Sequence, residues 1–125
     1  EFSFHNYGFA VRELIMADVA GNASDELMVA SETGYAYVLG AGGEVLAQLD
    51  FGEVVTDLGL LPRDGAKPMV AASTADGRIY TLDGALQPVA EWNADGEVSM
   101  VQALRTADGV RLLAVTHDGV VCLRP

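Results

Sequence analysis

The stretch AASTADGRIYTLDGALQPVAEW, which runs from Ala71 to Trp92, decides the fold class. It begins with an apolar run and continues through a turn that ends in Gly77. A run rich in β-branched and aromatic residues follows, then another turn and a last run that ends in Trp92. β-Branched and aromatic residues favour a pleated, packed surface, and an Asp-Gly pair favours a turn between strands. The stretch therefore predicts three short antiparallel strands joined by tight turns.

The same order of runs and turns occurs three times along the chain. Gly8, Gly52 and Gly96 begin the three repeats and stand 44 residues apart. Two of the repeats contain four strand-like runs, and the third reaches Pro125 before a fourth run. Periodicity typical of helices is absent. A period of this length with four short strands is typical of a β-propeller blade.

We therefore predict an all-β chain that forms a single, partial β-propeller domain of about three blades, each of four antiparallel strands. The opening segment stands where an outer strand stands in the other repeats. The predicted parts are an outer strand (1–8), a first blade (9–52), a second blade (53–96) and a third blade without its outer strand (97–125).

The third blade would lack its fourth strand, so the outer edge of its third strand would be unpaired. Such an edge invites pairing with another chain. Our hypothesis is that two chains close a six-bladed ring as a homodimer. The Phe2 to Asn6 strand of each chain would pair with the Val120 to Leu123 strand of the other. The alternative is that these residues are an excerpt of a longer propeller. The predicted assembly interface consists of Phe2, Phe4, Val120 and Cys122.

Two stretches resemble known propeller repeats. The Ala71 to Trp92 stretch resembles the quinoprotein-type repeat, in which Gly-x-hydrophobic-Tyr-x-Leu-Asp precedes a turn and a strand ending near Trp. The stretch from Ala17 to Val29, ADVAGNASDELMV, resembles the FG-GAP and VCBS repeats. These resemblances imply a propeller and are compatible with an extracytoplasmic location, but they do not imply a particular function. We match no quinone-binding position of the quinoprotein enzymes.

The FG-GAP resemblance implies a calcium site in the loop after the first strand. Its candidate ligands are Asp18, Asn22 and Asp25, since oxygen ligands suit this hard cation. Ala20 and Ala23 stand where the family pattern has a second acidic ligand and a glycine, which weakens the expected binding. The alternative is a polar turn in which these side chains cap backbone groups. No other cofactor is predicted.

Composition narrows the range of partners. Seven Lys and Arg against eighteen Asp and Glu give a formal net charge of −11. Such a charge disfavours nucleic acid and anionic membrane surfaces as partners. No apolar run approaches the roughly 20 residues that span a bilayer, and the opening residues do not form a signal peptide. The compartment therefore stays unknown.

Few residues suggest chemistry. We predict Cys122 to be buried and unreactive, because Val121 and Leu123 flank it on a strand. The only histidines, His5 and His117, make no zinc site, and His117 stands in a turn. If the dimer forms, both would lie near its seam and sense pH.

Asp50, Glu53 and Asp57 form a local acidic cluster that we interpret as a solvated loop face. The alternative is a surface that binds a cation or a basic partner. No motif for nucleophilic catalysis is present. The sequence therefore favours a non-catalytic scaffold that presents a binding surface to a protein or carbohydrate. The alternative is an enzyme or ligand site formed at the central channel of the closed ring. Carboxylates converging on that channel would favour this alternative.

Overall fold

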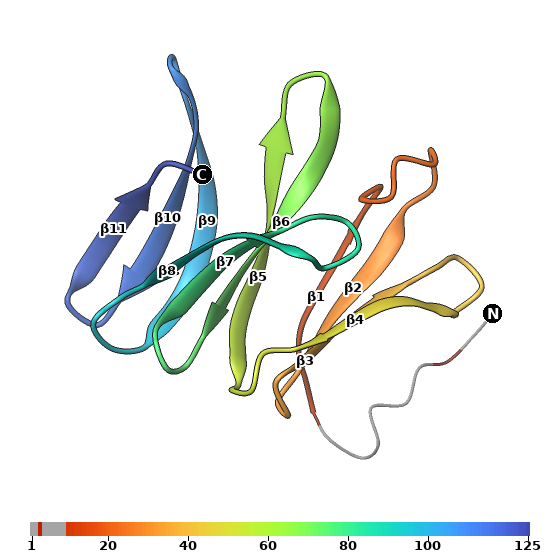
Figure 1. Cartoon of the computed structure of the whole chain (residues 1–125), viewed down its shortest axis with the longest axis horizontal. Coiled ribbons are helices and arrows are strands. Elements are labelled where there is room, and N and C mark those ends of the chain that lie inside the picture. The colour runs from red at the N-terminus through yellow and green to blue at the C-terminus, as the bar shows by residue number, and fades with distance from the viewer. Residues whose placement is uncertain (1–2, 4–9) are drawn as a thin grey trace.

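The computed structural model describes residues 3 and 10–125, which form eleven β-strands (Figure 1). The predicted Phe2 to Asn6 strand, with Phe4 and His5, lies outside the described residues. The strands are β1 (Val11–Ala17), β2 (Glu26–Ser31), β3 (Tyr35–Leu39), β4 (Val45–Asp50), β5 (Val55–Arg63), β6 (Ala66–Thr74), β7 (Arg78–Leu82), β8 (Pro88–Asn93), β9 (Val98–Thr106), β10 (Gly109–Thr116) and β11 (Gly119–Leu123).

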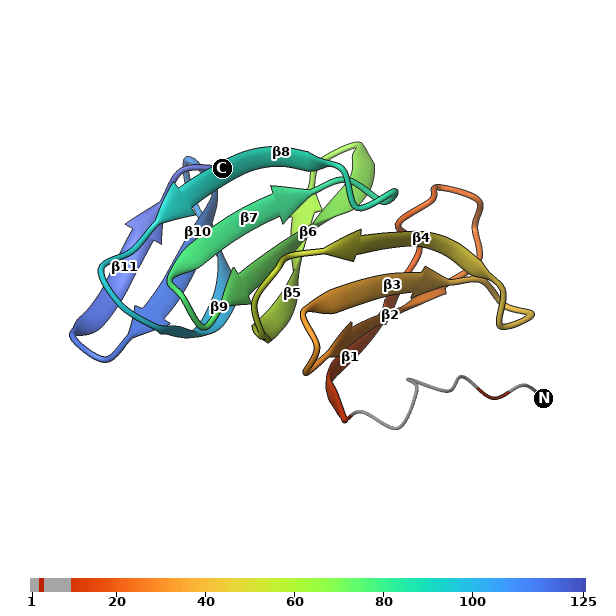
Figure 2. The same ribbon diagram turned by 60° about the horizontal axis from the view of Figure 1, so that its bottom comes forward.

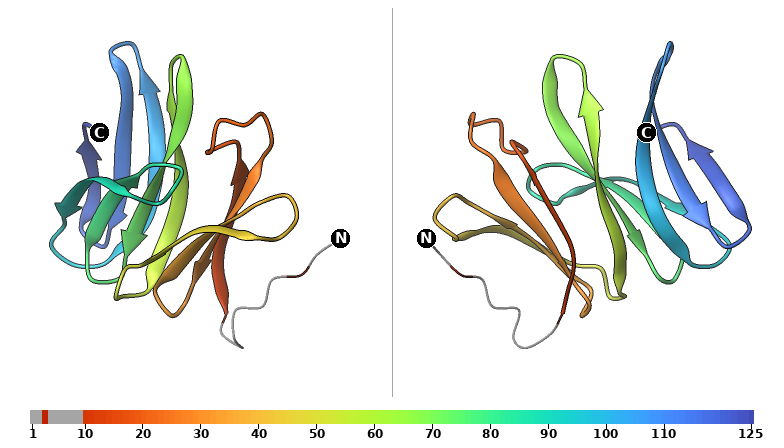
Figure 3. Two further views of the ribbon diagram at one scale, coloured as in Figure 1. Left: turned by 45° about the vertical axis from the view of Figure 1, so that its right-hand side comes forward. Right: turned by 180° about the vertical axis from the view of Figure 1, so that it is seen from behind.

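The strands form three separate antiparallel sheets. Their orders are β1-β2-β3-β4, β5-β6-β7-β8 and β9-β10-β11, so each sheet is a meander of neighbours in sequence. We name these sheets blades 1, 2 and 3. They fan out side by side, and β5, the first strand of blade 2, contacts the first strands of the other two blades, β1 and β9 (Figure 3). The predicted all-β fold of four-stranded antiparallel blades is confirmed.

Two turn glycines show why the repeat needs this residue. Gly34 and Gly77 have φ values of 96° and 94°, in the left-handed region that favours glycine. A Cβ atom on Gly77 would lie 2.5 Å from the Gly96 carbonyl oxygen, and one on Gly34 would lie 2.8 Å from that of Glu53. Each turn therefore packs directly against the chain that enters the next blade.

Two apolar layers join the blades. Side chains from β2, β3, β5, β6 and β7 fill the layer between blades 1 and 2. Blades 2 and 3 lie side by side (Figure 2). A smaller layer between them includes Leu61, Ile79, Leu112 and Ala114. The stacking of neighbouring sheets thus buries the faces that the apolar runs of the sequence predict.

The third blade differs from the other two in register. Ala72 and Ala114 both precede a turn glycine by five residues. Ala72 pairs with Tyr80, the third residue after Gly77, whereas Ala114 pairs with Val121, the second residue after Gly119. Because side chains alternate along a strand, this one-residue difference turns every side chain of β11 to the opposite face.

This register explains a wrong prediction. We predict a buried thiol from the apolar residues on either side of Cys122, and by repeat position Cys122 corresponds to Tyr37 and Tyr80, which are buried. Cys122 is instead exposed, because Val121 and Leu123 take the face toward blade 2. The turn between β10 and β11 has only two residues, His117 and Asp118, since Thr116 pairs directly with Gly119.

Candidate functional site

Two carboxylic acids meet on the first strands of blades 1 and 2. Glu13 of β1, Asp57 of β5 and Val101 of β9 occupy the same place in the three repeats, 44 residues apart. Asp57 Oδ2 accepts a hydrogen bond of 2.9 Å from the backbone N–H of Val101. The carboxyl of Glu13 lies beside that of Asp57, and the two share a hydrogen bond when one of them is protonated. One side chain therefore links all three blades where they converge.

This arrangement raises the pKa of Asp57. Burial raises it most, the Val101 N–H lowers it, and the hydrogen bond and negative charge of Glu13 raise it again. The interpretation of Asp57 as part of a solvated loop face is therefore wrong, because it lies within β5 between two other strands. The 44-residue spacing of two acids in the repeat was the signal that could have identified this pair.

The predicted calcium ligands lie in the loop between β1 and β2. Asp18 Oδ1 accepts the N–H groups of Gly21 at 2.7 Å and Asn22 at 3.0 Å, and its Oδ2 accepts that of Ala23 at 2.8 Å. Asn22 Oδ1 accepts the N–H of Ser24 at 2.9 Å. In three of these bonds the Asp18 carboxylate accepts from backbone N–H groups, as expected for a polar turn, which is the alternative to a calcium site. The calcium site stays a prediction.

The same bonds determine the ionisation of Asp18. Desolvation acts to raise its pKa, but the N–H donors of Asn22, Ala23 and Gly21, with the positive charge of Lys67, lower it on balance. The carboxylate is thus held in its charged, accepting form. The role that follows from these contacts is to shape the loop.

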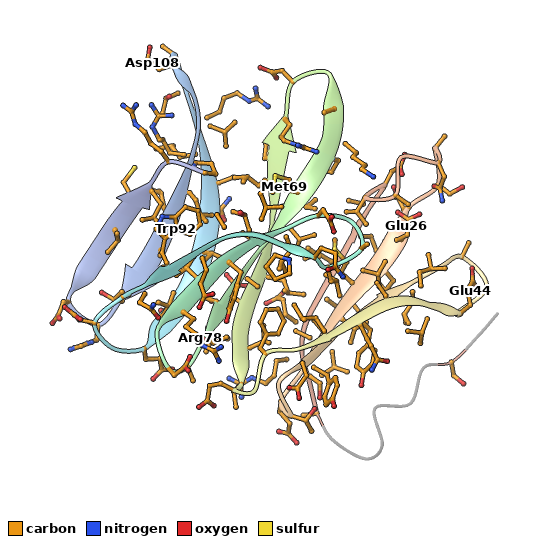
Figure 4. The ribbon with its side chains drawn as sticks, viewed as in Figure 1. Glu26, Glu44, Met69, Arg78, Trp92 and Asp108 are labelled. Atoms are coloured by element: carbon orange, nitrogen blue, oxygen red, sulfur yellow. The ribbon has the colours of Figure 1, made fainter. Side chains whose placement is uncertain are left out.

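Glu26, which the sequence did not single out, holds this loop in place. Glu26 begins β2 and has only 2% of its surface exposed (Figure 4). Its Oε2 accepts the N–H groups of Val19 at 2.9 Å and Ala20 at 3.1 Å. Buried carboxylates are retained where such donors compensate the lost hydration. Nothing in the repeat pattern marks Glu26, since its partners come from a loop found only in blade 1.

Arg78 clasps blade 2 to blade 1 at the outer strands (Figure 4). Its Nη2 donates to the Phe51 carbonyl oxygen at 2.6 Å, its Nη1 to the Tyr80 hydroxyl at 2.6 Å, and its Nε pairs with Asp76 at 3.0 Å. The Phe51 and Tyr80 rings meet edge to face at 5.1 Å. We name this set, Phe51, Asp76, Arg78 and Tyr80, the aromatic clasp.

The equivalent place between blades 2 and 3 is a groove of about 390 Å³. Ile79 and Trp92 of blade 2 line one side, and Val121 and Leu123 of β11 line the other. The predicted assembly residues Val120 and Cys122 lie on β11 with their side chains exposed on the opposite face. The other two, Phe2 and Phe4, lie outside the described residues.

His117 lies in the turn before β11, where the sequence placed it. Its Nε2 is 3.2 Å from Asp118 Oδ1, and both side chains are largely exposed. Its predicted companion, His5, lies outside the described residues. Their meeting at a seam stays a prediction.

A second groove, of about 560 Å³, lies between the β5–β6 and β9–β10 hairpins. Its lining is mainly apolar, with Arg63 and Arg105 also contributing. Among residues 10–125, no group of three or more His, Cys, Asp or Glu side chains has the geometry of a metal site. The described part of the chain also contains no helix that could cross a membrane.

Comparisons with known proteins place the fold. No protein-family model matches the sequence, and no curated protein matches it significantly. Two crystal structures of BBS1N in complex with ARL6DN, one soaked with mercury and one with lead, are similar, with TM-scores of 0.76 and 0.77. Each is 13% identical and matches 94% of this chain but 35% of its own. This chain thus spans about a third of the chains it matches, and its sheets have the fold of part of the BBS1N β-propeller.

Proposed function

We propose that this chain is a non-catalytic β-propeller scaffold that assembles through blade 3 with a second copy of itself. The outer edge of β11 is the observation that carries this proposal. In blades 1 and 2 the third strand, β3 or β7, is paired on both sides, whereas β11 pairs with β10 alone among the described residues. A free edge offers unpaired N–H and C=O groups to another strand.

The outward face of blade 3 supports the same proposal. Val120, Val115 and Met100 form one cross-strand row, and Val120 and Met100 are exposed. On the far face of blade 1, Leu14 and Met16 of β1 are also exposed, whereas the side chains of β2 and β3 on that face are buried. Between neighbouring blades, the corresponding faces are covered by apolar layers. Exposed apolar surface of this kind is typical of interaction sites.

The proposed partner strand is the Phe2 to Asn6 segment of the second copy. In this arrangement two chains close one ring, and each completes the blade of the other. If the chain belongs to a longer propeller, the neighbouring blades of that protein would cover the same edge and face. The measured mass of the chain separates these two cases.

The test is the mass in solution by light scattering over a range of concentrations, for the wild type and two variants. We expect a dimer for the wild type and a monomer for Val120→Lys, because an edge lysine opposes strand addition. Val89→Lys on β8 is the matched control, since Val89 and Val120 are 62% and 64% exposed. A folded monomer for the wild type at all concentrations would exclude self-assembly.

The binding role has two further supports. BBS1N, whose fold this chain shares in part, was solved in complex with ARL6DN, a protein partner. Loops on a rigid β-scaffold are common places for ligands. We infer that a protein or carbohydrate is the ligand class. A closer relation to quinoprotein-type or FG-GAP repeats rests on the sequence resemblance alone.

An enzyme is the second candidate, because one observation favours it. Glu13 and Asp57 converge on the side where the first strands meet, and the pKa of Asp57 is raised by burial and by Glu13. A carboxyl whose pKa is raised beside a second carboxyl is a common acid–base device. Hydrolysis of a panel of chromogenic glycosides and esters by the wild type, and its loss in Asp57→Asn, would replace the scaffold with this candidate.

A further inference from the structure

We propose that the groove between the β5–β6 and β9–β10 hairpins binds an acidic peptide segment of another protein. An apolar side chain of the peptide lies in the groove, and its carboxylates bind Arg63 and Arg105. The proposal rests on the proposed role as a binding scaffold. It adds the site and the ligand chemistry, and it is independent of how many chains form a ring.

The hairpins form the groove because their strands are long. β5, β6 and β9 have nine residues each and β10 has eight, whereas β7 and β11 have five. The two hairpins therefore project beyond the blades as a pair (Figure 1). The apolar lining of the groove between them consists of Leu60, Pro62, Ala66, Pro68 and Ala103.

Two arginines from different blades face this groove. Arg63 Nε donates to the Lys67 carbonyl oxygen at 3.0 Å, which holds the guanidinium at the hairpin. Its Nη groups bond to no acceptor among the described residues. Arg105 makes one contact across the groove, from Nη1 to Asp64 Oδ1 at 3.2 Å, with both side chains mostly exposed. Exposed pairs of this kind contribute little and exchange readily for another carboxylate.

The distribution of charge singles out these hairpins. Residues 60–69 and 102–112 contain four of the seven Lys and Arg in the chain but only two of its eighteen Asp and Glu. The hairpins are thus locally cationic on a protein whose other surfaces are strongly acidic. An anionic ligand is repelled elsewhere, so the charge pattern directs it to this one place.

The lining determines which anion fits. A carboxylate binds an arginine guanidinium through two parallel hydrogen bonds, and each arginine has N–H groups for one such pair. The five apolar side chains between the arginines favour a ligand that also carries an apolar group. A nucleic acid would offer phosphates alone and would have to cross the acidic surface around the hairpins. An acidic peptide with an apolar residue between its carboxylates combines both features.

The test is fluorescence anisotropy with a short labelled peptide in which Asp and Glu flank a central Leu. The matched control peptide carries Lys in place of Asp and Glu. Measurements at about 0.15 M ionic strength suit the proposal, since the Debye length of about 8 Å screens the distant acidic surface. We expect saturable binding of the acidic peptide and none of the Lys peptide.

Three variants locate the site. Arg63→Gln and Arg105→Gln should each weaken binding about tenfold, because each removes a charge-assisted hydrogen-bonding group. Arg111→Gln is the control, since Arg111 is cross-strand from Leu104 and thus lies on the face opposite Arg105. It should change affinity less than about twofold.

Asp64→Asn gives a change that misfolding cannot mimic. It frees Arg105 and removes a negative charge from the groove, so binding should tighten about twofold. Equal binding of the Lys peptide or of single-stranded DNA would overturn the proposal, as would equal weakening by Arg111→Gln. If the acidic peptide does not bind and Arg105→Gln lowers the mass of the chain, the occupant is a second copy and this proposal fails. The mass of Val120→Lys tests the scaffold separately.

Discussion

The two contacts between blades differ although the same repeat builds both. Between blades 1 and 2 the aromatic clasp closes the outer end, and Phe51 and Tyr80 are 5% and 6% exposed. Between blades 2 and 3, Ala94 occupies the place of Phe51. The Phe51 N–H donates to the carbonyl oxygen of Gly34, and the Ala94 N–H donates to that of Gly77, the equivalent turn glycine. Val121, in the place of Tyr80, is 40% exposed.

The difference shows that a repeat specifies strands more strictly than it specifies the contacts between blades. Each blade forms by pairing of strands that are neighbours in sequence. The packing between blades depends on a few large side chains at the outer strands. Among the described residues, blade 3 has neither these side chains nor a fourth strand, so both its groove and its edge are open. The contact between blades 1 and 2 should be the more stable of the two.

The largest expected effect on stability comes from two leucines at equivalent positions in blades 2 and 3. Leu82 pairs with Val70 and Leu123 pairs with Leu112, each on the face toward the preceding blade. Leu82 is fully buried and Leu123 is half-buried. We expect Leu82→Ala to lower the free energy of unfolding by about 3 kcal/mol and Leu123→Ala by about 1 kcal/mol. Urea denaturation measures both, and equal losses would contradict the open groove.

The aromatic clasp gives the next effect. Arg78→Gln removes the bonds to Phe51 and Asp76, and we expect a loss of about 1–2 kcal/mol after allowance for the partly exposed ion pair. Arg111→Gln is the control, because among the described residues its guanidinium bonds only the Val110 carbonyl oxygen, and it should cost less than about 0.5 kcal/mol. Similar losses for the two variants in urea denaturation would show that the clasp contributes nothing beyond an ordinary surface arginine.

A substitution that fills the groove between blades 2 and 3 should increase the stability of the chain. Ala94→Phe places in the second contact the side chain that closes the first, and it should fill part of the groove beside Ile79 and Trp92. We expect a gain of about 1 kcal/mol, which is about 4 °C in Tm for a chain of this size. Ala107→Phe, at the exposed tip of the β9–β10 turn, should give no gain in the same calorimetric measurement.

The smallest effect concerns pH. The pKa of Asp57 is raised by burial and by Glu13, so the folded state holds this proton more tightly than the unfolded chain. The resulting stabilisation is fully present below the unfolded pKa of about 3.9 and is lost as pH rises through the folded pKa. Asp57→Asn and Glu13→Gln should both flatten this part of the stability curve. An unchanged slope in both variants would mean that the two carboxyls do not interact in solution.

Much of the fold could be predicted because its signals are local. The glycines at Gly34 and Gly77 mark turns in the sequence, and the same residues adopt positive φ where a Cβ would collide with the next segment. The apolar runs mark strands in the sequence, and two of these strands, β2 and β6, are covered on both faces. The candidate site was less predictable. Glu26 and Arg78 bond to groups that are far away in the sequence or lie in a loop without repeat symmetry.

By itself, the sequence determined the blades: turn glycines and apolar runs at a constant spacing dictate antiparallel meanders of three or four strands. Only the tertiary structure decided which face each β11 side chain occupies. One residue fewer separates Ala114 from its partner than separates Ala72 from its own, and this turns the side chains of β11 to the opposite face. It also decided that Glu13 meets Asp57, and that two arginines from different blades line one groove. Such contacts depend on the angle at which blades pack, and no short stretch of sequence encodes that angle.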